Sequence, residues 1–261
     1  MTMQLPFLLR ASIYGLVFVS LLFVEWLAPF AKSQQKKSFR VVFHLGLSIA
    51  NSLILYVLVA FPALALVGYT EAHSFGLAHV LGLHGPAEIP ATVVVLDFWD
   101  YWMHMANHKI GFLWRFHKAH HSDMEVDVTT ASRFHTGELL ISGMFKCLMI
   151  LLWGPSLWGL AIFEALLTGA SQFHHSNIAI PLRLQDAIET VIVTPRMHRC
   201  HHALHSDCVQ SNFSAIFSGW DRVFRSYHWS RDPHELYPLG VRDLRGPATM
   251  RLKDFVLTPF L

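Results

Sequence analysis

Long apolar runs separated by short polar segments fill the first two thirds of the chain. Four runs stand out, at residues 11–30, 41–68, 89–108 and 139–173. The first carries Glu25 as its only charge, and the last is interrupted at Gly154 and Pro155. Since a membrane-spanning helix needs about 20 mostly apolar residues, the pattern predicts an all-α integral membrane protein with about four transmembrane helices. The interrupted run is a re-entrant helical hairpin or two short tilted spans.

Basic residues near the ends of the runs predict the orientation of the protein in the membrane. The segment after the first run contains Lys32, Lys36, Lys37 and Arg40, whereas residues 70–90 contain no Lys or Arg. The first of these segments is therefore expected in the cytoplasm and the second outside. This topology places residues 104–135 and 174–228 in one cytosolic, histidine-rich helical cap. We expect a single domain over residues 1–261, in a bacterial inner membrane with its site on the cytoplasmic side.

The composition excludes several classes of protein. Hydrophobic residues make up 53% of the chain and charged residues 15%, and the mean hydropathy is +0.38. A soluble enzyme would carry roughly 25% charged residues, and a disordered chain would be far less apolar. The net charge of +2 is too small to indicate binding to nucleic acid. Three cysteines cannot form a disulfide framework, but 18 histidines are more than ordinary structural roles require.

Three short motifs contain eight of these histidines. One has the spacing HxxxH and two have the spacing HxxHH, and residues at i, i+3 and i+4 share one face of a helix. Crowding three imidazoles onto one helical turn is costly unless they bind something, so the motifs indicate metal ligands. The motif histidines are His104, His108, His117, His120, His121, His198, His201 and His202.

One histidine of the pair His174 and His175 would bring the set to nine, which suits two metal ions with four or five ligands each. Asp97 and Asp100 precede His104 on the same expected helix and could accept the second N–H of a bound imidazole. The candidates for a further ligand, or for a side chain that orients the ligands, are His135, His174, His205, Asp97, Asp100 and Asp221. No separate catalytic side chain is assigned beyond the two-metal centre itself.

Imidazole binds iron, zinc and copper, so the type of ligand does not choose the metal. A site at the edge of a membrane suits oxidation of a lipid C–H bond, which no side chain can perform alone. Activation of O2 requires a redox metal, which favours two non-haem iron ions with O2 as co-substrate. Zinc has no redox chemistry but can substitute in a purified sample.

Other classes of function remain open from the residues alone. A membrane zinc hydrolase would carry a carboxylate within its ligand motif, as in HExxH, and neither HxxHH motif contains one. A non-enzymatic haem carrier would place single histidines on facing spans. A metal transporter would distribute its ligands along a path through the membrane. An optical spectrum would separate a haem protein from a non-haem one.

The three motifs and their surroundings resemble the histidine boxes of the fatty acid hydroxylase / sterol desaturase superfamily. The resemblance extends from Asp97 to Tyr227, about half of the chain. It includes the segments FLWRFHKAHHSD (112–123), DVTTASRFH (127–135), FHHSN (173–177), TPRMH (194–198), SNF (211–213) and GWDRVF (219–224).

The resemblance implies a membrane-bound, O2-dependent di-iron lipid hydroxylase or desaturase of the monooxygenase type. It makes His175 the ligand of the His174–His175 pair. Some members have a tenth ligand where this chain has Ser171, which leaves His135 as a substitute. Electrons would come from a separate donor, which is a ferredoxin, a cytochrome b5-like protein or a flavoprotein reductase. The lipid, the choice between hydroxylation and desaturation, and the oligomeric state stay open.

Overall fold

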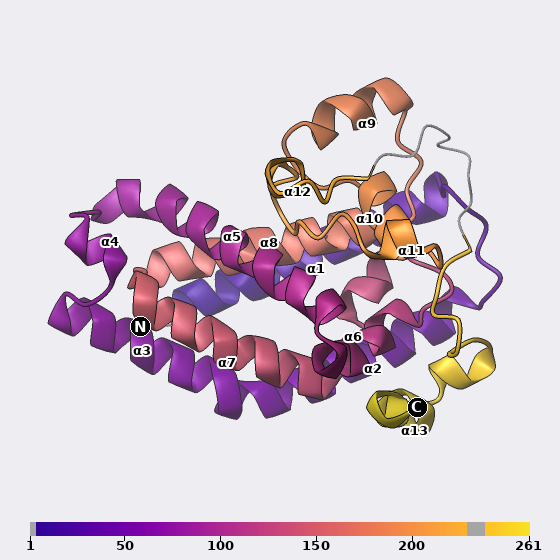
Figure 1. The fold of residues 1–261 in the computed structure, drawn as a ribbon, viewed down its shortest axis with the longest axis horizontal. Helices are drawn as coiled ribbons and strands as arrows, with labels where there is room; N and C mark the ends of the chain where they lie inside the picture. Colours follow the sequence, from indigo (N-terminus) through magenta and orange to yellow (C-terminus); the bar gives the residue numbers. More distant parts are fainter. Residues whose placement is uncertain (1–3, 229–237) are drawn as a thin grey trace.

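The protein is all-helical, as the apolar pattern predicts (Figure 1). The computed structural model describes residues 4–228 and 238–261, and within these ranges only isolated β-bridges occur, with no strand. The long helices are α1 (Gln4–Leu27), α2 (Lys37–Leu55), α3 (Phe61–His73), α5 (Glu88–Lys109), α7 (Thr136–Trp153) and α8 (Leu157–His175). The shorter ones are α4 (Leu77–Val80), α6 (Gly111–His121), α9 (Leu182–Glu189), α10 (Pro195–His201), α11 (Ser206–Val209), α12 (Gly219–Val223) and α13 (Leu252–Leu257).

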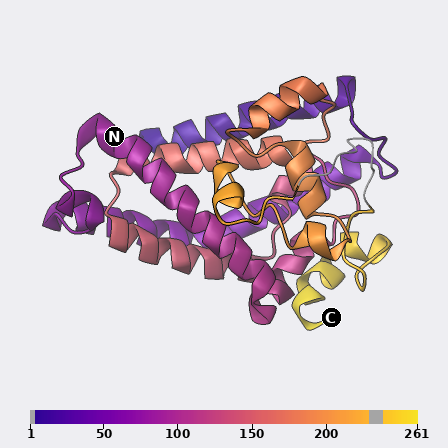
Figure 2. The same ribbon diagram turned by 45° about the horizontal axis from the view of Figure 1, so that its top comes forward.

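The long helices run beside one another along the length of the molecule (Figures 1 and 2). Helix α8 packs against both α1 and α5, and α7 packs against α3. Helices α6 and α9–α13 gather at one end of this bundle, whereas α4 lies at the other end. The bundle therefore has two chemically different ends, and the end with the short helices contains all three histidine motifs.

Two of the apolar runs contain a local change of helix geometry. The run at 41–68 forms one helical stretch in which a wider π-type turn, Tyr56–Ala60, joins α2 to α3. The run at 139–173 forms a helical hairpin that turns at Gly154, where φ is 72°. A Cβ at Gly154 would collide with the carbonyl oxygen of Phe75. Glycine is required here both for the left-handed backbone and for the close approach of the segment around Phe75 to the hairpin turn.

Two helical stretches of the described residues are long and apolar enough to cross a membrane, Lys37–Val80 and Thr136–Trp153. Ala11–Leu27 is apolar but shorter. Helix α5 carries Glu88, Asp97, Asp100 and Lys109, which lower its hydropathy despite its 22 residues. The all-α prediction is therefore confirmed, and two of the expected spans are supported by length and composition.

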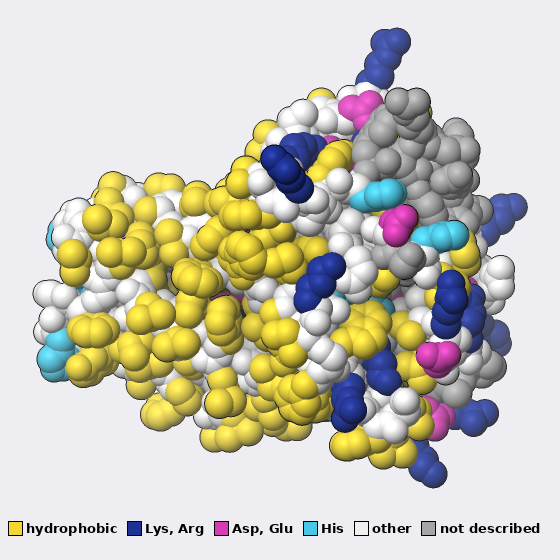
Figure 3. Space-filling model, viewed as in Figure 1, with side chains coloured by type: hydrophobic (Ala, Val, Ile, Leu, Met, Phe, Trp, Pro, Cys, Tyr) yellow, Lys and Arg dark blue, Asp and Glu magenta, His cyan; other side chains and the backbone are white. Residues whose placement is uncertain are grey.

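The surface of the bundle is predominantly apolar. Large side chains such as Leu16, Val42, Leu53 and Met144 are each at least 70% exposed. On the face drawn in Figure 3, hydrophobic side chains cover the elongated part of the molecule, while Lys and Arg gather at the end with the short helices. Monomeric soluble proteins rarely expose apolar patches of this extent, so this surface indicates a non-aqueous environment around the helices.

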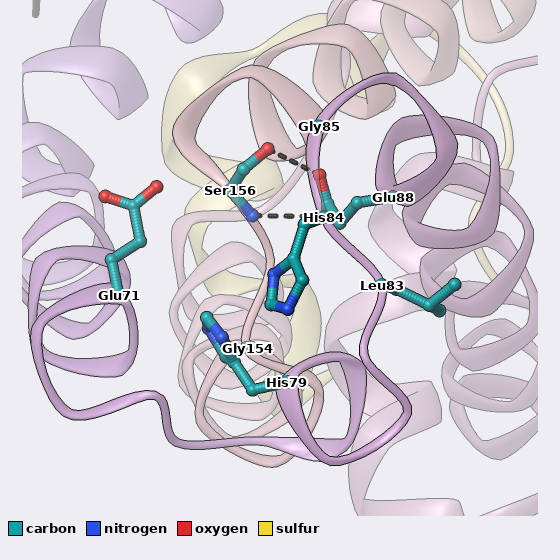
Figure 4. Close-up of a pocket in the computed structure, with 8 residues that line it drawn as sticks. All are labelled: Glu71, His79, Leu83, His84, Gly85, Glu88, Gly154 and Ser156. Atoms are coloured by element: carbon teal, nitrogen blue, oxygen red, sulfur yellow. Dashed lines mark hydrogen bonds between the residues drawn. The ribbon is translucent and has the colours of Figure 1, made fainter.

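At the end of the bundle far from the histidine motifs, Glu88, a buried carboxylate at the start of α5, lies against Ser156 (Figure 4). Its oxygens accept hydrogen bonds from the backbone N–H and the hydroxyl of Ser156 at 3.1 and 2.5 Å, and from the hydroxyl of Thr92. Trp153 Nε1 in turn donates to Thr92 Oγ1 at 2.6 Å. A small open cavity of about 150 Å³ lies beside this network. Glu88 thus fixes the start of α8 against α5.

Buried ion pairs connect α2 to the segment that follows α6. The Arg40 guanidinium is fully buried and binds both carboxylate oxygens of Asp123 at 2.7 and 2.8 Å and one oxygen of Asp127 at 2.8 Å. Lys37 forms ion pairs with Glu25 and Asp127. Two of the four basic residues used to predict the orientation are therefore paired within the protein. Arg40 therefore has a structural role, because it binds Asp123 and Asp127 and so fixes the segment just after His121.

Replacing Arg40 with Met is expected to destabilise the fold by about 3–5 kcal/mol, because it leaves the Asp123 and Asp127 carboxylates buried without their cation. Lys36→Met is the matched control, since Lys36 is exposed. Thermal and denaturant unfolding in detergent would measure both variants. Equal stability of the two variants would contradict the structural role of Arg40.

Candidate metal centre

Four helices bring nine histidines together in two groups at one end of the bundle. They come from the last turns of α5, from α6, from the end of α8, and from α10 with the residue that follows it. Within each group the candidate ligand atoms all lie within 4.8 Å of one another. One group contains His104, His108, His117, His121 and His201, and the other contains His120, His175, His198 and His202.

Each HxxHH motif contributes to both groups. In the first motif, His117 and His121 belong to the group of five, whereas His120 belongs to the group of four. In the second motif the assignment is reversed, because His198 and His202 lie in the group of four and His201 lies in the other. Positions i+3 and i+4 differ by about 100° around a helix. Two adjacent histidines therefore point into two different sites.

The two groups are neighbours. The ring of His121 stacks on the ring of His202 with centroids 4.3 Å apart and planes 17° apart, and these rings belong to different groups. His117 and His120, also from different groups, have centroids 5.5 Å apart. The arrangement can therefore hold two neighbouring metal ions, one in each group, with imidazole rings of the two groups in contact between them.

Outer hydrogen bonds fix the orientation of five of the nine rings. Because a carbonyl oxygen can only accept, an imidazole Nδ1 beside one must carry the proton, which leaves Nε2 of the neutral ring with a lone pair. Metal-binding histidines are commonly held in this way. The contacts run from Nδ1 of His104 to Phe213 O (2.8 Å), His120 to Arg133 O (3.0 Å), His175 to Ser171 O (2.7 Å), His201 to Ser211 O (2.7 Å), and His117 to Glu138 Oε1 (2.6 Å).

The contact between His120 and His175 tests whether a cation fits the site. Both rings donate through Nδ1, yet their Nε2 atoms lie 3.1 Å apart. Two neutral imidazoles in this state face each other with two lone pairs and no proton between them. Burial lowers the pKa of His120 well below its usual value, which disfavours an added proton. A metal ion between the rings satisfies both lone pairs, so the donor set fits a metal.

Other buried ring nitrogens lead to the same conclusion. Both nitrogens of His108, Nε2 of His201 and Nδ1 of His121 have no hydrogen-bond partner within the described part of the chain. Burial, followed by the neighbouring imidazoles, lowers the pKa of His121 and His202 well below the usual value. Neutral imidazole is the form that binds metals, and unpaired buried nitrogens are otherwise costly.

The remaining candidate histidines lie outside both groups. His174 is buried with its ring centroid 4.0 Å from that of His198. His135 precedes α7, where its Nδ1 accepts from the N–H of Gly137 and its Nε2 contacts Val256 O at 3.1 Å. His205 is exposed. Of these three, only His174 borders the nine histidines.

Two of the candidate aspartates, Asp221 and Asp97, bind backbone N–H groups of the segment between α11 and α12. Asp221 accepts hydrogen bonds from the backbone N–H of Phe213 at 2.8 Å, and the carbonyl of Phe213 accepts from His104. Asp97 accepts from the N–H groups of residues 216 and 217 and from Trp220 Nε1. Asp97 precedes His104 by seven residues, about 10.5 Å along the helix, which is too far for direct contact.

Asp100 lies on α5 and is half-buried. The charged side chains that act on it most strongly are Lys146 of α7 and Glu164 of α8, which are paired at 2.7 Å. Asp100 therefore belongs to a charged cluster between α5, α7 and α8. The expectation that Asp97 would accept an N–H from a bound imidazole is wrong, because its oxygens accept from residues 216, 217 and 220. For Asp100 the same expectation stays a prediction.

Sequence reasoning missed Glu138 and the carbonyl acceptors. Glu138 belongs to no histidine motif and follows His117 by 21 residues, yet it contacts His117 Nδ1 at 2.6 Å. The pattern of side chains along a sequence does not show which backbone carbonyls will accept from the imidazoles. Here they are the carbonyls of Ser171, Arg133, Ser211 and Phe213. Only the packing of α6, α8 and α10 brings these acceptors to the rings.

Comparison with known proteins adds a family match. A model of the fatty acid hydroxylase family matches residues 89–226, which include all nine histidines. The chain is 31% identical to the alkylglycerol monooxygenase of Xenopus tropicalis over 52% of this chain and 29% of that protein. It is 28% identical to the human alkylglycerol monooxygenase over 51% of this chain and 28% of that protein.

A bacterial relative matches over a longer region. The ornithine lipid hydroxylase OlsE of Rhizobium tropici is 26% identical over 78% of this chain and 62% of that protein. The chain thus spans less than a third of the length of the alkylglycerol monooxygenases that it matches. No solved structure matches the chain.

Replacing Glu138 with Ala is expected to lower metal affinity by about 10–100-fold, the usual effect of removing the acceptor behind a metal-bound histidine. Glu138→Gln keeps the shape and one acceptor oxygen, so its loss should be smaller. Competition with a chelator would measure the affinity. Asp186→Ala, at an exposed ion pair with Arg196, is the control. Unchanged affinity in Glu138→Ala would show that this carboxylate does not support the site.

Proposed function

The chain belongs to the fatty acid hydroxylase family, and from this premise we propose that it is a membrane enzyme that oxidises a lipid C–H bond with O2. The observation that carries the proposal is the division of nine histidines into neighbouring groups of five and four. We assign one iron ion to each group, with the nine histidines as ligands. When bound, the iron pair supplies the redox chemistry that activates O2, which imidazole side chains cannot supply. Zinc can fill the same groups in a purified sample without supporting oxidation.

The protein's own groups prepare the site for metal. Carbonyl acceptors behind His104, His120, His175 and His201 keep the outer Nδ1 protonated and direct Nε2 inward. Glu138 does the same for His117 and increases its basicity. Eight of the nine rings are buried, which excludes water from most of the site.

Among the nine, His104 is only half-buried, which favours it as the point of entry. It lies near the end of α5, a long helix of the apolar bundle. We propose that the lipid chain approaches along α5 and presents a C–H bond to the group of five. In this arrangement the reacting carbon stays in the apolar layer while the iron ligands stay at its edge.

Hydroxylation is favoured over desaturation because the relatives compared above are named monooxygenases or a hydroxylase. In that reaction R–H, O2, two electrons and two protons give R–OH and water. One oxygen atom enters the lipid, and the other leaves as water. The relatives' names indicate lipids with a glycerol ether or an ornithine headgroup, and we propose a polar membrane lipid as the substrate class.

We propose that the bundle crosses the membrane about four times, with α1, α2–α3 and α5 as spans and the α7–α8 hairpin as the fourth element. The histidine-rich end would form a cytosolic cap of the bacterial inner membrane, and the whole chain would be one domain. The apolar surface of the bundle and the basic residues at the cap support this disposition (Figure 3). Exposed Lys109 and Arg115 lie near the centre and suit a separate, acidic electron donor of the ferredoxin, cytochrome b5-like or flavoprotein type.

The competing functions receive less support. Both groups consist of histidines alone among the described residues, and the one carboxylate that contacts a ring, Glu138, lies behind it. A hydrolytic zinc site needs a carboxylate that faces bound water. Imidazole nitrogens within 4.8 Å of one another leave no room for a haem. Ligands confined to one end of the bundle do not form a path for metal transport.

Substitution of His120 by Ala is expected to abolish lipid oxidation and lipid-dependent O2 uptake while the protein stays in the membrane. His73→Ala is the matched control, because His73 is exposed in the last turn of α3 and lies outside both histidine groups. Both variants would be assayed in membranes with an electron donor and candidate polar lipids. Full activity of His120→Ala would contradict the proposal.

A further inference from the structure

A third cluster of metal-binding side chains lies outside the nine histidines. The thiols of Cys200 and Cys208 and the imidazole of His228 place their ligand atoms within 4.8 Å of one another. Both cysteines are buried, at 2% and 4% exposure, and His228 is half-buried. We propose that these three residues bind a zinc ion, separate from the two iron ions.

Three different segments of the chain form this cluster. Cys200 lies on α10 between two histidines of the second HxxHH motif, Cys208 lies on α11, and His228 follows α12. His228 belongs to none of the three histidine motifs. Seven residues separate Cys200 from Cys208 and nineteen separate Cys208 from His228, which does not match a familiar zinc-finger spacing.

Hydrogen bonds hold the cluster in place without a metal. The side chain of Asn212 accepts from the N–H of His228 at 2.9 Å and donates to its carbonyl at 3.0 Å. The same amide group also contacts the carbonyl of Met197 on α10 at 3.1 Å. Asn212 has a φ of 56°, a left-handed backbone that asparagine tolerates better than most residues. The hydroxyl of Ser211 donates to the carbonyl of Cys208 at 2.7 Å.

The chemistry of these ligands favours zinc. Zinc binds thiolate sulfur at about 2.3 Å and imidazole nitrogen at about 2.0–2.1 Å, so tetrahedral ligand atoms lie about 3.4–3.8 Å apart. The observed cluster is compact enough to close to this geometry. Two thiolates neutralise the charge of Zn²⁺, and thiolate ligands select against hard ions such as Mg²⁺. Three protein ligands leave one position of the tetrahedron for a water molecule. Water can reach this position because His228 is only half-buried.

Packing alone explains only part of the cluster. A reduced cysteine often behaves as a small apolar side chain, and Cys200 and Cys208 do pack with Ala203. Packing gives no reason for an imidazole to meet both thiols. A zinc ion there would tie α10 to the segment around His228, and so steady His198 and His201 without touching substrate.

Cobalt substitution would test the proposal on the full-length protein, purified in detergent with a reducing agent. Cobalt bound to thiolate gives an intense near-ultraviolet charge-transfer band that cobalt bound only to imidazole does not give. Cobalt and zinc would be counted per chain in the wild type, Cys200→Ser, Cys208→Ser and His228→Gln. Cys147→Ser is the matched control, because Cys147 lies on α7 outside the cluster.

The expected result is a charge-transfer band in the wild type and in Cys147→Ser. Cys200→Ser and Cys208→Ser should each weaken or remove the band and lose one zinc per chain while the histidine-bound ions remain. His228→Gln keeps both thiols and should weaken zinc binding by more than about tenfold, which preserves the test if a cysteine variant fails to fold. The proposal would be overturned if the wild type gave no band at saturating cobalt. It would also be overturned if Cys200 and Cys208 formed a disulfide in protein purified with a reducing agent. The readout is specific to thiolate and does not depend on iron or activity.

Discussion

The gathering of nine imidazoles, eight of them buried, at one end of an apolar bundle is the constraint on which the rest of the structure depends. Carbonyl oxygens fix the protons of several rings on the outside, which forces lone pairs to face each other, as in His120 and His175. Protonation could relieve this repulsion, but burial lowers the pKa of rings such as His121 and His198. A metal ion bound between such rings would relieve it without adding a buried, unpaired proton. The arrangement of the nine rings therefore fits a metal-bound centre.

The surrounding residues hold the segments that carry these acceptors. Arg133 is fully buried, and its guanidinium donates to Ser122 and to the carbonyls of Ala119 and Thr249. The carbonyl of Arg133 accepts a hydrogen bond from His120 Nδ1. Arg40 fixes the adjacent turn through Asp123. Although burial opposes ionisation, Arg40 holds the pKa of the Asp123 carboxyl well below its usual range. The charged groups of Arg40, Asp123 and Arg133 thus hold chain segments in place beside the histidines.

The sequence predicted those features that depend on local periodicity. Apolar runs gave the long helices, Gly154 marked the turn of the hairpin, and the HxxHH spacing placed histidines on one helical face. The division of each motif between two groups was not predictable, because it depends on how α6 and α10 face each other. The contacts of Glu138 with His117 and of Arg40 with Asp123 were missed because each joins segments that are far apart in the sequence. Their partners lie 20 or more residues away, and no local pattern records such contacts.

Metal analysis together with Mössbauer spectroscopy of the purified protein, after anaerobic loading with iron, would test whether the nine histidines form two iron sites. We expect two iron ions per chain. Because one group offers five imidazoles and the other four, we also expect two distinct ferrous signals of equal area. One iron or none per chain, or two that exchange freely with weak chelators, would contradict the two-site centre.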